Sequence, residues 1–222
     1  MIRNVLAAAT LTIATATLAI ATPMIATAAQ PAAAASAQLG VPSQMVLSNS
    51  QRVISTLEKR RPEFTKNRAA LRAYVNSEFN QMFDRDYAAK LVLGRHARGA
   101  SPADVSAFST ALGDNLMQRY GSSLLDFNTK LTPRVKSEAA LPNGLGVRVN
   151  SELVRGGGDP VPVTYLMHQV GGQWKVFDVM VEGVSFVQTF RNQFDAPLAQ
   201  KGIKAVAADL ASGQMQASTK SK

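Results

Sequence analysis

The sequence predicts a single α+β domain in which helices come first, an antiparallel sheet follows, and further helices close the chain. Between residues 43 and 127, apolar residues recur three or four positions apart, the spacing of amphipathic helices. After Pro133 the pattern changes to short β-branched runs separated by turns rich in glycine and proline. Helical spacing returns after Gly183. This order predicts a twisted antiparallel sheet of about four to five strands packed against helices.

The first half of the chain is expected to begin with three helices. The first starts at Ser43 and ends at Pro62, and the second carries an apolar stripe from Leu71 to Phe83. The third, "DRDYAAKLVLG", ends at Gly94, where a left-handed cap is expected.

The clearest helix follows, over residues 101–127. Ser101 suits its N-cap and Pro102 its first helical position. Gly113 and Gly121 weaken the pattern and indicate kinks or close approaches.

Four β-branched runs predict a strand meander: "KLTPRVKSEAAL", "GVRVNSELV", "VPVTYLMHQV" and "QWKVFDVMV". In the second and third runs one face is mainly apolar, and the "GGG" at 156–158 indicates a flexible turn between them. Two last helices are expected in "GVSFVQTFRNQFDAPLAQ" and "GIKAVAADLAS".

The last of these runs is unusual because it is apolar on both faces. A half-buried strand alternates apolar and polar residues. Strict alternation here places Trp174, Val176 and Met180 on one face and Phe177, Val179 and Val181 on the other. Asp178 is the only polar residue inward of the ends, so this strand must be buried on both sides.

The N-terminus predicts export. Residues 1–29 have one basic residue, Arg3, then an uncharged apolar run and a small-residue site, Ala26-Thr27-Ala28. This is typical of a cleaved signal peptide; the alternative is an uncleaved membrane anchor. The predicted organisation is a signal peptide (1–29), a flexible leader (30–42), one domain (43–212) and a disordered tail (213–222).

Composition limits the partners. The chain has no cysteine, so the core alone must hold the fold. Its net charge of +9, which falls by one when Arg3 is removed, suits anionic membranes, anionic ligands or an acidic partner protein. Export argues against nucleic acid, and the basic run Lys59–Arg61 is interpreted as a solvated helix end.

Catalytic chemistry is not expected. The two histidines, His96 and His168, have no ligand cluster around them, so neither a metal site nor a cofactor is predicted. Asp178, desolvated in its apolar strand, is a hypothetical general base with a raised pKa. The favoured interpretation is that it accepts hydrogen bonds and fixes the strand end.

Several segments resemble one family. The runs "KLVLG" (90–94), "ASPADVSAFSTAL…LMQRYGSSL" (100–124), "WKVFDVMVEGVSFV" and "LAQKGIKAV" are similar to the MlaC family of periplasmic phospholipid-binding proteins, also called the toluene-tolerance family. The resemblance covers about residues 43–212, and "DVMVEGVS" after a tryptophan strand is its most specific part.

The resemblance implies a soluble periplasmic carrier with a cone fold like that of nuclear transport factors. Such a carrier shuttles phospholipid between an outer-membrane lipoprotein–porin complex and an inner-membrane ABC transporter with an MCE-domain subunit, and so maintains outer-membrane lipid asymmetry. A monomer suffices, and phospholipid is cargo, not a cofactor. Acyl chains would lie between sheet and helices, so one face of strand 174–181 would pack the core and the other would face lipid.

Physical chemistry sets the requirement for such a pocket. Two acyl chains hold about thirty methylenes, each worth about 0.8 kcal/mol on burial, so the pocket must be apolar. It must also stay under-packed, because a core at normal density has no room for acyl chains. Helix 101–127 and helix 184–194 are expected to move apart when lipid is taken up or handed over. The alternatives are a cone-fold enzyme using Asp178 and a secreted interaction module without ligand. The predicted pocket residues are Leu91, Leu93, Phe108, Leu112, Leu116, Tyr120, Leu124, Val149, Leu153, Tyr165, Met167, Trp174, Val176, Phe177, Val179, Met180, Val184, Val187 and Phe190.

Overall fold

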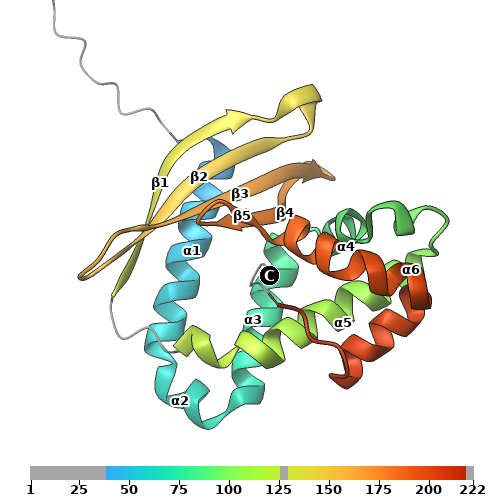
Figure 1. Cartoon of the computed structure of the whole chain (residues 1–222). Coiled ribbons are helices and arrows are strands. Elements are labelled where there is room, and N and C mark those ends of the chain that lie inside the picture. The colour runs from blue at the N-terminus through green and yellow to red at the C-terminus, as the bar shows by residue number, and fades with distance from the viewer. Residues whose placement is uncertain (1–38, 126–129, 219–222) are drawn as a thin grey trace, which may run out of the picture. The chain divides into compact units, whose positions relative to one another are not determined.

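In the described part of the chain, five α-helices precede a five-stranded sheet, and a long helix that is broken once follows it (Figure 1). The computed structural model describes residues 39–125 and 130–218. The helices are α1 (Val41–Lys59), α2 (Arg61–Lys66), α3 (Arg68–Met82), α4 (Arg85–Leu93), α5 (Pro102–Tyr120) and α6 (Phe186–Ser212). The strands are β1 (Leu131–Ala140), β2 (Val147–Arg155), β3 (Val161–Val170), β4 (Gln173–Val181) and β5 (Val184–Ser185). The predicted α+β class and strand number are confirmed.

The prolines start helices at the N-terminal end of the domain. Pro42 stands in the first turn of α1, which therefore begins at Val41 rather than at Ser43, inside the segment predicted as a flexible leader. Pro62 likewise stands in the first turn of α2, because a first-turn N–H needs no helical acceptor. The side chain of Asn67 then accepts a hydrogen bond from the N–H of Ala70 and starts α3.

The predicted ends of α4 and α5 need correction. Gly94 has the expected positive φ of 55°, but its ψ of −122° is not that of a left-handed cap, and the chain continues as a 3₁₀ turn to Ala97. The N-cap of α5 is confirmed, since the Ser101 hydroxyl accepts from the N–H of Asp104 at 3.1 Å. This helix ends at Tyr120, although Gly121 keeps helical angles (φ −59°, ψ −34°), and the chain continues as a 3₁₀ turn over Ser122–Leu125. The predicted end at Phe127 lies outside the described residues.

The sheet is an antiparallel meander in the order β1-β2-β3-β4-β5. Val149 of β2 lies opposite Tyr165 of β3, and Val147 lies opposite Met167, so the predicted apolar face is confirmed. The turn before β2 requires glycine at position 146, where a Cβ would lie 1.9 Å from the carbonyl oxygen of Met167.

A β-bulge overturns the predicted faces of β4. Leu166 of β3 pairs with Asp178 and Met167 with Val176, so Phe177 has no partner in the register. An extra residue in one strand shifts the alternation beyond it. Val176 and Val179 therefore share a face, whereas Met180 lies on the opposite one. Strict alternation had placed Val176 with Met180 and was wrong for this reason.

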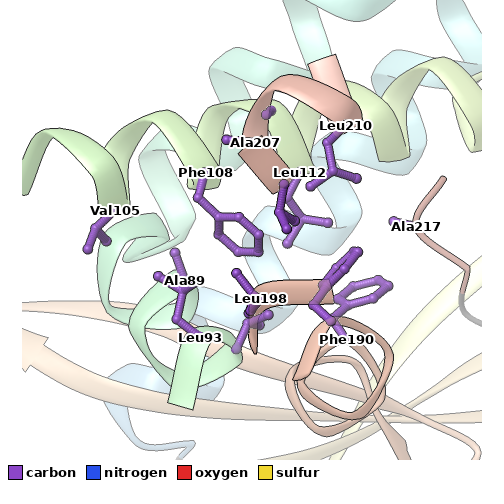
Figure 2. Close-up of a cluster of buried hydrophobic side chains, with 14 residues drawn as sticks. Ala89, Leu93, Val105, Phe108, Leu112, Phe190, Leu198, Ala207, Leu210 and Ala217 are labelled. Atoms are coloured by element: carbon purple, nitrogen blue, oxygen red, sulfur yellow. The ribbon is translucent and has the colours of Figure 1, made fainter. Parts of the chain in front are cut away.

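The core forms separate clusters. The helical cluster joins α4, α5 and α6, and Figure 2 shows Phe108 and Leu112 of α5 facing Leu198 and Phe190 of α6. The sheet cluster joins α1, α3 and the sheet: Val46, Met82, Val149, Met167 and Val176, with Tyr165, Trp174 and Val179 packed against them. A third cluster, around Phe64, Leu71 and Leu125, joins α2 and α3.

Helix α1 is held to the sheet at both polar and apolar points. The Glu138 carboxylate of β1 accepts hydrogen bonds from the N–H (3.0 Å) and hydroxyl (2.6 Å) of Ser43. Gly40 lies close to this carboxylate, so a Cβ at position 40, 2.5 Å from a Glu138 oxygen, would displace the Glu138 side chain. Burial raises the pKa of the Tyr165 phenol, and its hydrogen bond with Ser50 of α1 acts in the opposite direction.

The two helices predicted at the C-terminal end are confirmed, but the tail differs from the sequence expectation. Helix α6 breaks at Gly202, where φ is 77° and ψ is 171°, so it consists of two helical parts that meet where the sequence placed the boundary. Residues 213–218, predicted as disordered, pack against α5. Ala217 is fully buried, and its N–H donates to Asn115 Oδ1 at 2.9 Å. The Asn115 amide in turn donates to the carbonyl oxygens of Leu210 and Met215.

The predicted signal peptide lies outside the described residues. Within the described part of the chain, no helix has the length and hydropathy to cross a bilayer.

Asn115 gives a first prediction. Asn115→Ala removes three hydrogen bonds, among them those to the Met215 carbonyl oxygen and the Ala217 N–H of the tail, so we expect the free energy of unfolding to fall by about 2–3 kcal/mol. Urea unfolding measures it. Asn192→Ala, at an exposed position of α6, is the matched control and should change stability by less than about 0.5 kcal/mol. Equal stabilities of the two variants would contradict the anchoring role.

Candidate functional site

An apolar cavity of about 250 Å³ lies between the edge of the sheet and the helices. Its wall comes from α3, α4, α5, β4 and the start of α6. Leu112 and Phe190 contribute from the helical cluster, whereas Phe83 and Val179 pack against the sheet cluster. The cavity therefore occupies the seam between two packed cores. Strand β5 pairs only with Met180 and Val181, which leaves the earlier part of the β4 edge to face the helices.

The Asp178 side chain forms hydrogen bonds with the start of α6 beside this cavity. It is buried, with 6% of its surface exposed. Its Oδ2 accepts from the Ser185 hydroxyl at 2.6 Å and its Oδ1 from the N–H of Val187 at 3.0 Å. Ser185 is itself the N-cap of α6. Both carboxylate oxygens thus accept hydrogen bonds, as the structural interpretation of Asp178 predicted.

The Asp84 side chain likewise forms a hydrogen bond with the start of α4. Its Oδ1 accepts from the N–H of Tyr87 at 3.0 Å, and its Oδ2 lies 3.0 Å from His168 Nε2 on β3. Its backbone N–H donates to the carbonyl oxygen of Val176 on β4. Two carboxylates therefore hold the first turns of two helices at either side of the cavity.

Aromatic rings fill the space behind the β4 bulge. The Phe177 ring meets Tyr87 edge-on at 5.4 Å and His168 at 5.2 Å between ring centroids. His168 is half-buried and stacks on Tyr87, while His96 pairs with Asp195 at 2.9 Å. No group of three or more acidic, histidine or cysteine side chains that could hold a metal ion occurs among the described residues.

A polar cavity of about 360 Å³ adjoins the apolar one. The two share Phe83, Arg85 and Ser109 as wall residues. Arg85 donates to Asn80 Oδ1 at 2.8 Å and to the carbonyl oxygen of Ser109 at 3.2 Å. Lys175 reaches the same cavity from β4 and donates to the carbonyl oxygen of Gln81 at 2.6 Å.

The residues predicted to line a pocket are distributed over several places. Those that line the apolar cavity are Leu112, Leu116, Phe177, Val179, Val187 and Phe190. Leu93 and Phe108 lie in the helical cluster, and Val149, Tyr165, Met167, Trp174 and Val176 lie in or against the sheet cluster. Leu91, Tyr120, Leu124, Leu153 and Met180 are half-buried outside this cavity, and Val184 is 43% exposed.

Sequence reasoning missed other wall residues. Phe79 and Phe83 were already on the apolar stripe of α3, so their spacing could have indicated them. Ala88 and Gly113 could not be found from apolar spacing, because they contribute to the cavity through their small size. Arg85 was not found because its neighbours come from distant parts of the chain.

These features define a class of protein: an α+β domain with an unfilled apolar cavity between its sheet edge and its helices. The sequence model of the family described as "MlaC protein" matches residues 47–212, and the chain belongs to this family. The family resemblance found in the sequence is therefore confirmed.

Two relatives and one solved structure fit this membership. The toluene tolerance protein ttg2D of Pseudomonas putida is 26% identical over 71% of this chain and 73% of its own. The intermembrane phospholipid transport system binding protein MlaC of Haemophilus influenzae is 23% identical over 69% of this chain and 73% of its own. A phospholipid-binding protein of Ralstonia solanacearum, solved with a phospholipid, has the same fold (TM-score 0.68, 20% identity, 77% of this chain and 94% of that one).

Asp178 gives a second prediction. Asp178→Ala removes both hydrogen bonds to the start of α6, so we expect a loss of about 3 kcal/mol in the free energy of unfolding and faster exchange of the Val187 amide hydrogen. Urea unfolding and hydrogen exchange measure the two effects. Asp114→Ala removes an exposed carboxylate from α5 and serves as the control. An Asp178→Ala protein as stable as this control would show that the carboxylate does not hold the helix.

Proposed function

We propose that this protein carries phospholipid through the periplasm. The observation that carries the proposal is the apolar cavity at the seam between the helical and sheet clusters. A protein interior packed at ordinary density leaves no such volume, and its loss of contacts costs stability unless a ligand fills it. The relatives' names and the phospholipid bound to the Ralstonia protein support phospholipid as the cargo.

The finer proposal concerns transport. The chain would be exported by a cleaved signal peptide and act as a monomer, without a cofactor. It would exchange phospholipid between an outer-membrane lipoprotein–porin complex and an inner-membrane ABC transporter with an MCE-domain subunit, and so maintain lipid asymmetry. The relative named as a component of an intermembrane phospholipid transport system supports this route.

Loading requires the cavity to grow. Its 250 Å³ lies below the roughly 300–1,000 Å³ of typical small-molecule sites, and two whole acyl chains need more. Helices α5 and α6 share one cluster, with the Phe108 and Phe194 rings 5.8 Å apart. We therefore place the movement between the helical cluster and the sheet, rather than between α5 and α6.

Release follows from the same physics. Moving about thirty methylenes into water costs more than about 20 kcal/mol, so a lipid leaves only when a partner offers comparable burial. The carrier needs matched affinity rather than a catalytic group. Asp178, the one candidate base, already uses both oxygens to hold α6.

The direct test is the cargo itself. Protein purified from the periplasm without detergent should contain about one phospholipid per chain when its lipid extract is analysed by mass spectrometry. Protein that contains no lipid, and takes none from vesicles of phosphatidylethanolamine and phosphatidylglycerol, would contradict the proposal.

Filling the cavity should block this uptake. Ala88 of α4 lines the cavity, so Ala88→Phe places a ring in the space for acyl chains, and we expect lipid per chain to fall at least about tenfold while the fold persists. Ala107→Phe, at an exposed position of α5, adds the same ring outside the cavity and should keep its lipid. Full lipid content in the Ala88→Phe protein would place the cargo elsewhere.

Replacing Asp178 separates the carrier from the enzyme hypothesis. Asp178→Asn keeps an acceptor for the N–H of Val187, so we expect the purified protein to keep its phospholipid. Mass spectrometry of the bound lipid checks this. A folded Asp178→Asn protein that retains a lipid which the wild type converts into another product would favour catalysis.

A further inference from the structure

The polar cavity beside the apolar one has the composition of a head-group site. The two cavities adjoin and share Phe83, Arg85 and Ser109 as wall residues, so a molecule with its apolar part in one would have its polar part beside the other. This inference rests on the proposed function, and it concerns the part of the lipid that the apolar cavity does not hold.

Two cations face the polar cavity without carboxylate partners. Arg85 donates to a side-chain amide oxygen and a backbone carbonyl, and Lys175 donates to a backbone carbonyl. All three acceptors are neutral. In the part of the chain that the structure describes, neither cation is within 4.0 Å of a carboxylate oxygen. Their charges are therefore available to an anion.

The position of Arg85 is set from several directions. Its guanidinium carbon lies 5.9 Å from the centre of the Phe79 ring on α3. The absence of a side chain at Gly113 of α5 leaves it room, since a Cβ there would lie 3.3 Å from Arg85 Nη2. A planar guanidinium held this way at the boundary of the two cavities suits a phosphate, which accepts paired hydrogen bonds from it.

Two carboxylates also line the polar cavity, and they narrow the choice of ligand. Asp84 already binds the N–H of Tyr87 and His168. Asp86, in the first turn of α4, is exposed and lines the same cavity. A wall with both signs of charge suits a zwitterionic head group, with its phosphate toward the cations and its ammonium toward Asp86.

We propose that Arg85 and Lys175 bind the phosphodiester of the carried lipid in the polar cavity while its acyl chains occupy the apolar cavity. Charge-assisted hydrogen bonds to phosphate are stronger than neutral ones. The head group is then recognised as well as the chains, and a lipid without phosphate is a poorer cargo.

Two short-chain probes test this with the lipid-free full domain. Dioctanoyl phosphatidylethanolamine and dioctanoylglycerol have the same acyl chains, and only the first has a phosphate. By isothermal titration calorimetry we expect the wild type to bind the phospholipid at least about tenfold more tightly. Lys175→Gln, which keeps a hydrogen-bond donor but no charge, should reduce phospholipid affinity about tenfold and leave dioctanoylglycerol affinity unchanged.

Matched variants complete the design. Arg85→Gln should act in the same direction as Lys175→Gln and supplies an independent result if one variant folds poorly. Lys90→Gln removes one charge from an exposed position of α4 outside both cavities and should bind both probes like the wild type. Thermal unfolding followed by circular dichroism confirms that each variant is folded.

The outcomes separate the two proposals. Equal affinity of the wild type for both probes, or equal losses for both probes in Lys175→Gln, would overturn the head-group site and leave the carrier function intact. Binding of neither probe would overturn the carrier function. Glycerol 3-phosphate distinguishes a lipid head group from free phosphate: it should not bind at concentrations that saturate with the phospholipid, and tight binding of it would overturn the assignment to lipid.

Discussion

Carboxylates at the first turns of three helices fix the arrangement of this domain. Glu138 of β1 binds the first turn of α1, Asp178 of β4 binds that of α6, and Asp84 caps α4 while it contacts β3 through His168. The first turn of a helix has free N–H groups and a partial positive charge, so a carboxylate is stabilising there. The helices are thus held to the sheet at their starts, and the remainder of each is positioned by apolar packing.

That arrangement explains how the domain keeps a cavity without losing its shape. An interior with one continuous core would close over the empty volume, because dispersion contacts favour filling it. Here the helical and sheet clusters are each packed within themselves, and the cavity lies where they meet. The hydrogen bonds of Asp178 and Asp84 span this junction, so they keep the clusters together while the apolar surfaces between them stay partly unpaired. Local opening at such a junction costs less than unfolding either cluster.

The sequence was sufficient for most elements but not for the site. The capping signal at Ser101 and the alternation in β2 and β3 have local causes, and both were found. The bulge at Phe177 was missed because an unpaired residue leaves no trace in apolar alternation. The burial of Ala217 was missed because the acceptor that fixes it, Asn115, lies far away in the chain.

The wall of the apolar cavity could be predicted only in part, for a related reason. Apolar spacing shows that Phe108 and Leu116 are buried on the same helix, but not that one meets Phe194 in a packed core while the other faces open volume. The polar cavity could not be predicted from the sequence, because only the tertiary fold brings Arg85 and Lys175 to the same place.

The unpaired Phe177 also matters for anyone who aligns this chain with its relatives. Pairing in a sheet couples position to orientation, so an error of one residue exchanges inward for outward side chains. A comparison that gives β4 uniform alternation, without room for one additional residue, would assign Asp178 and Met180 to the wrong side of the sheet.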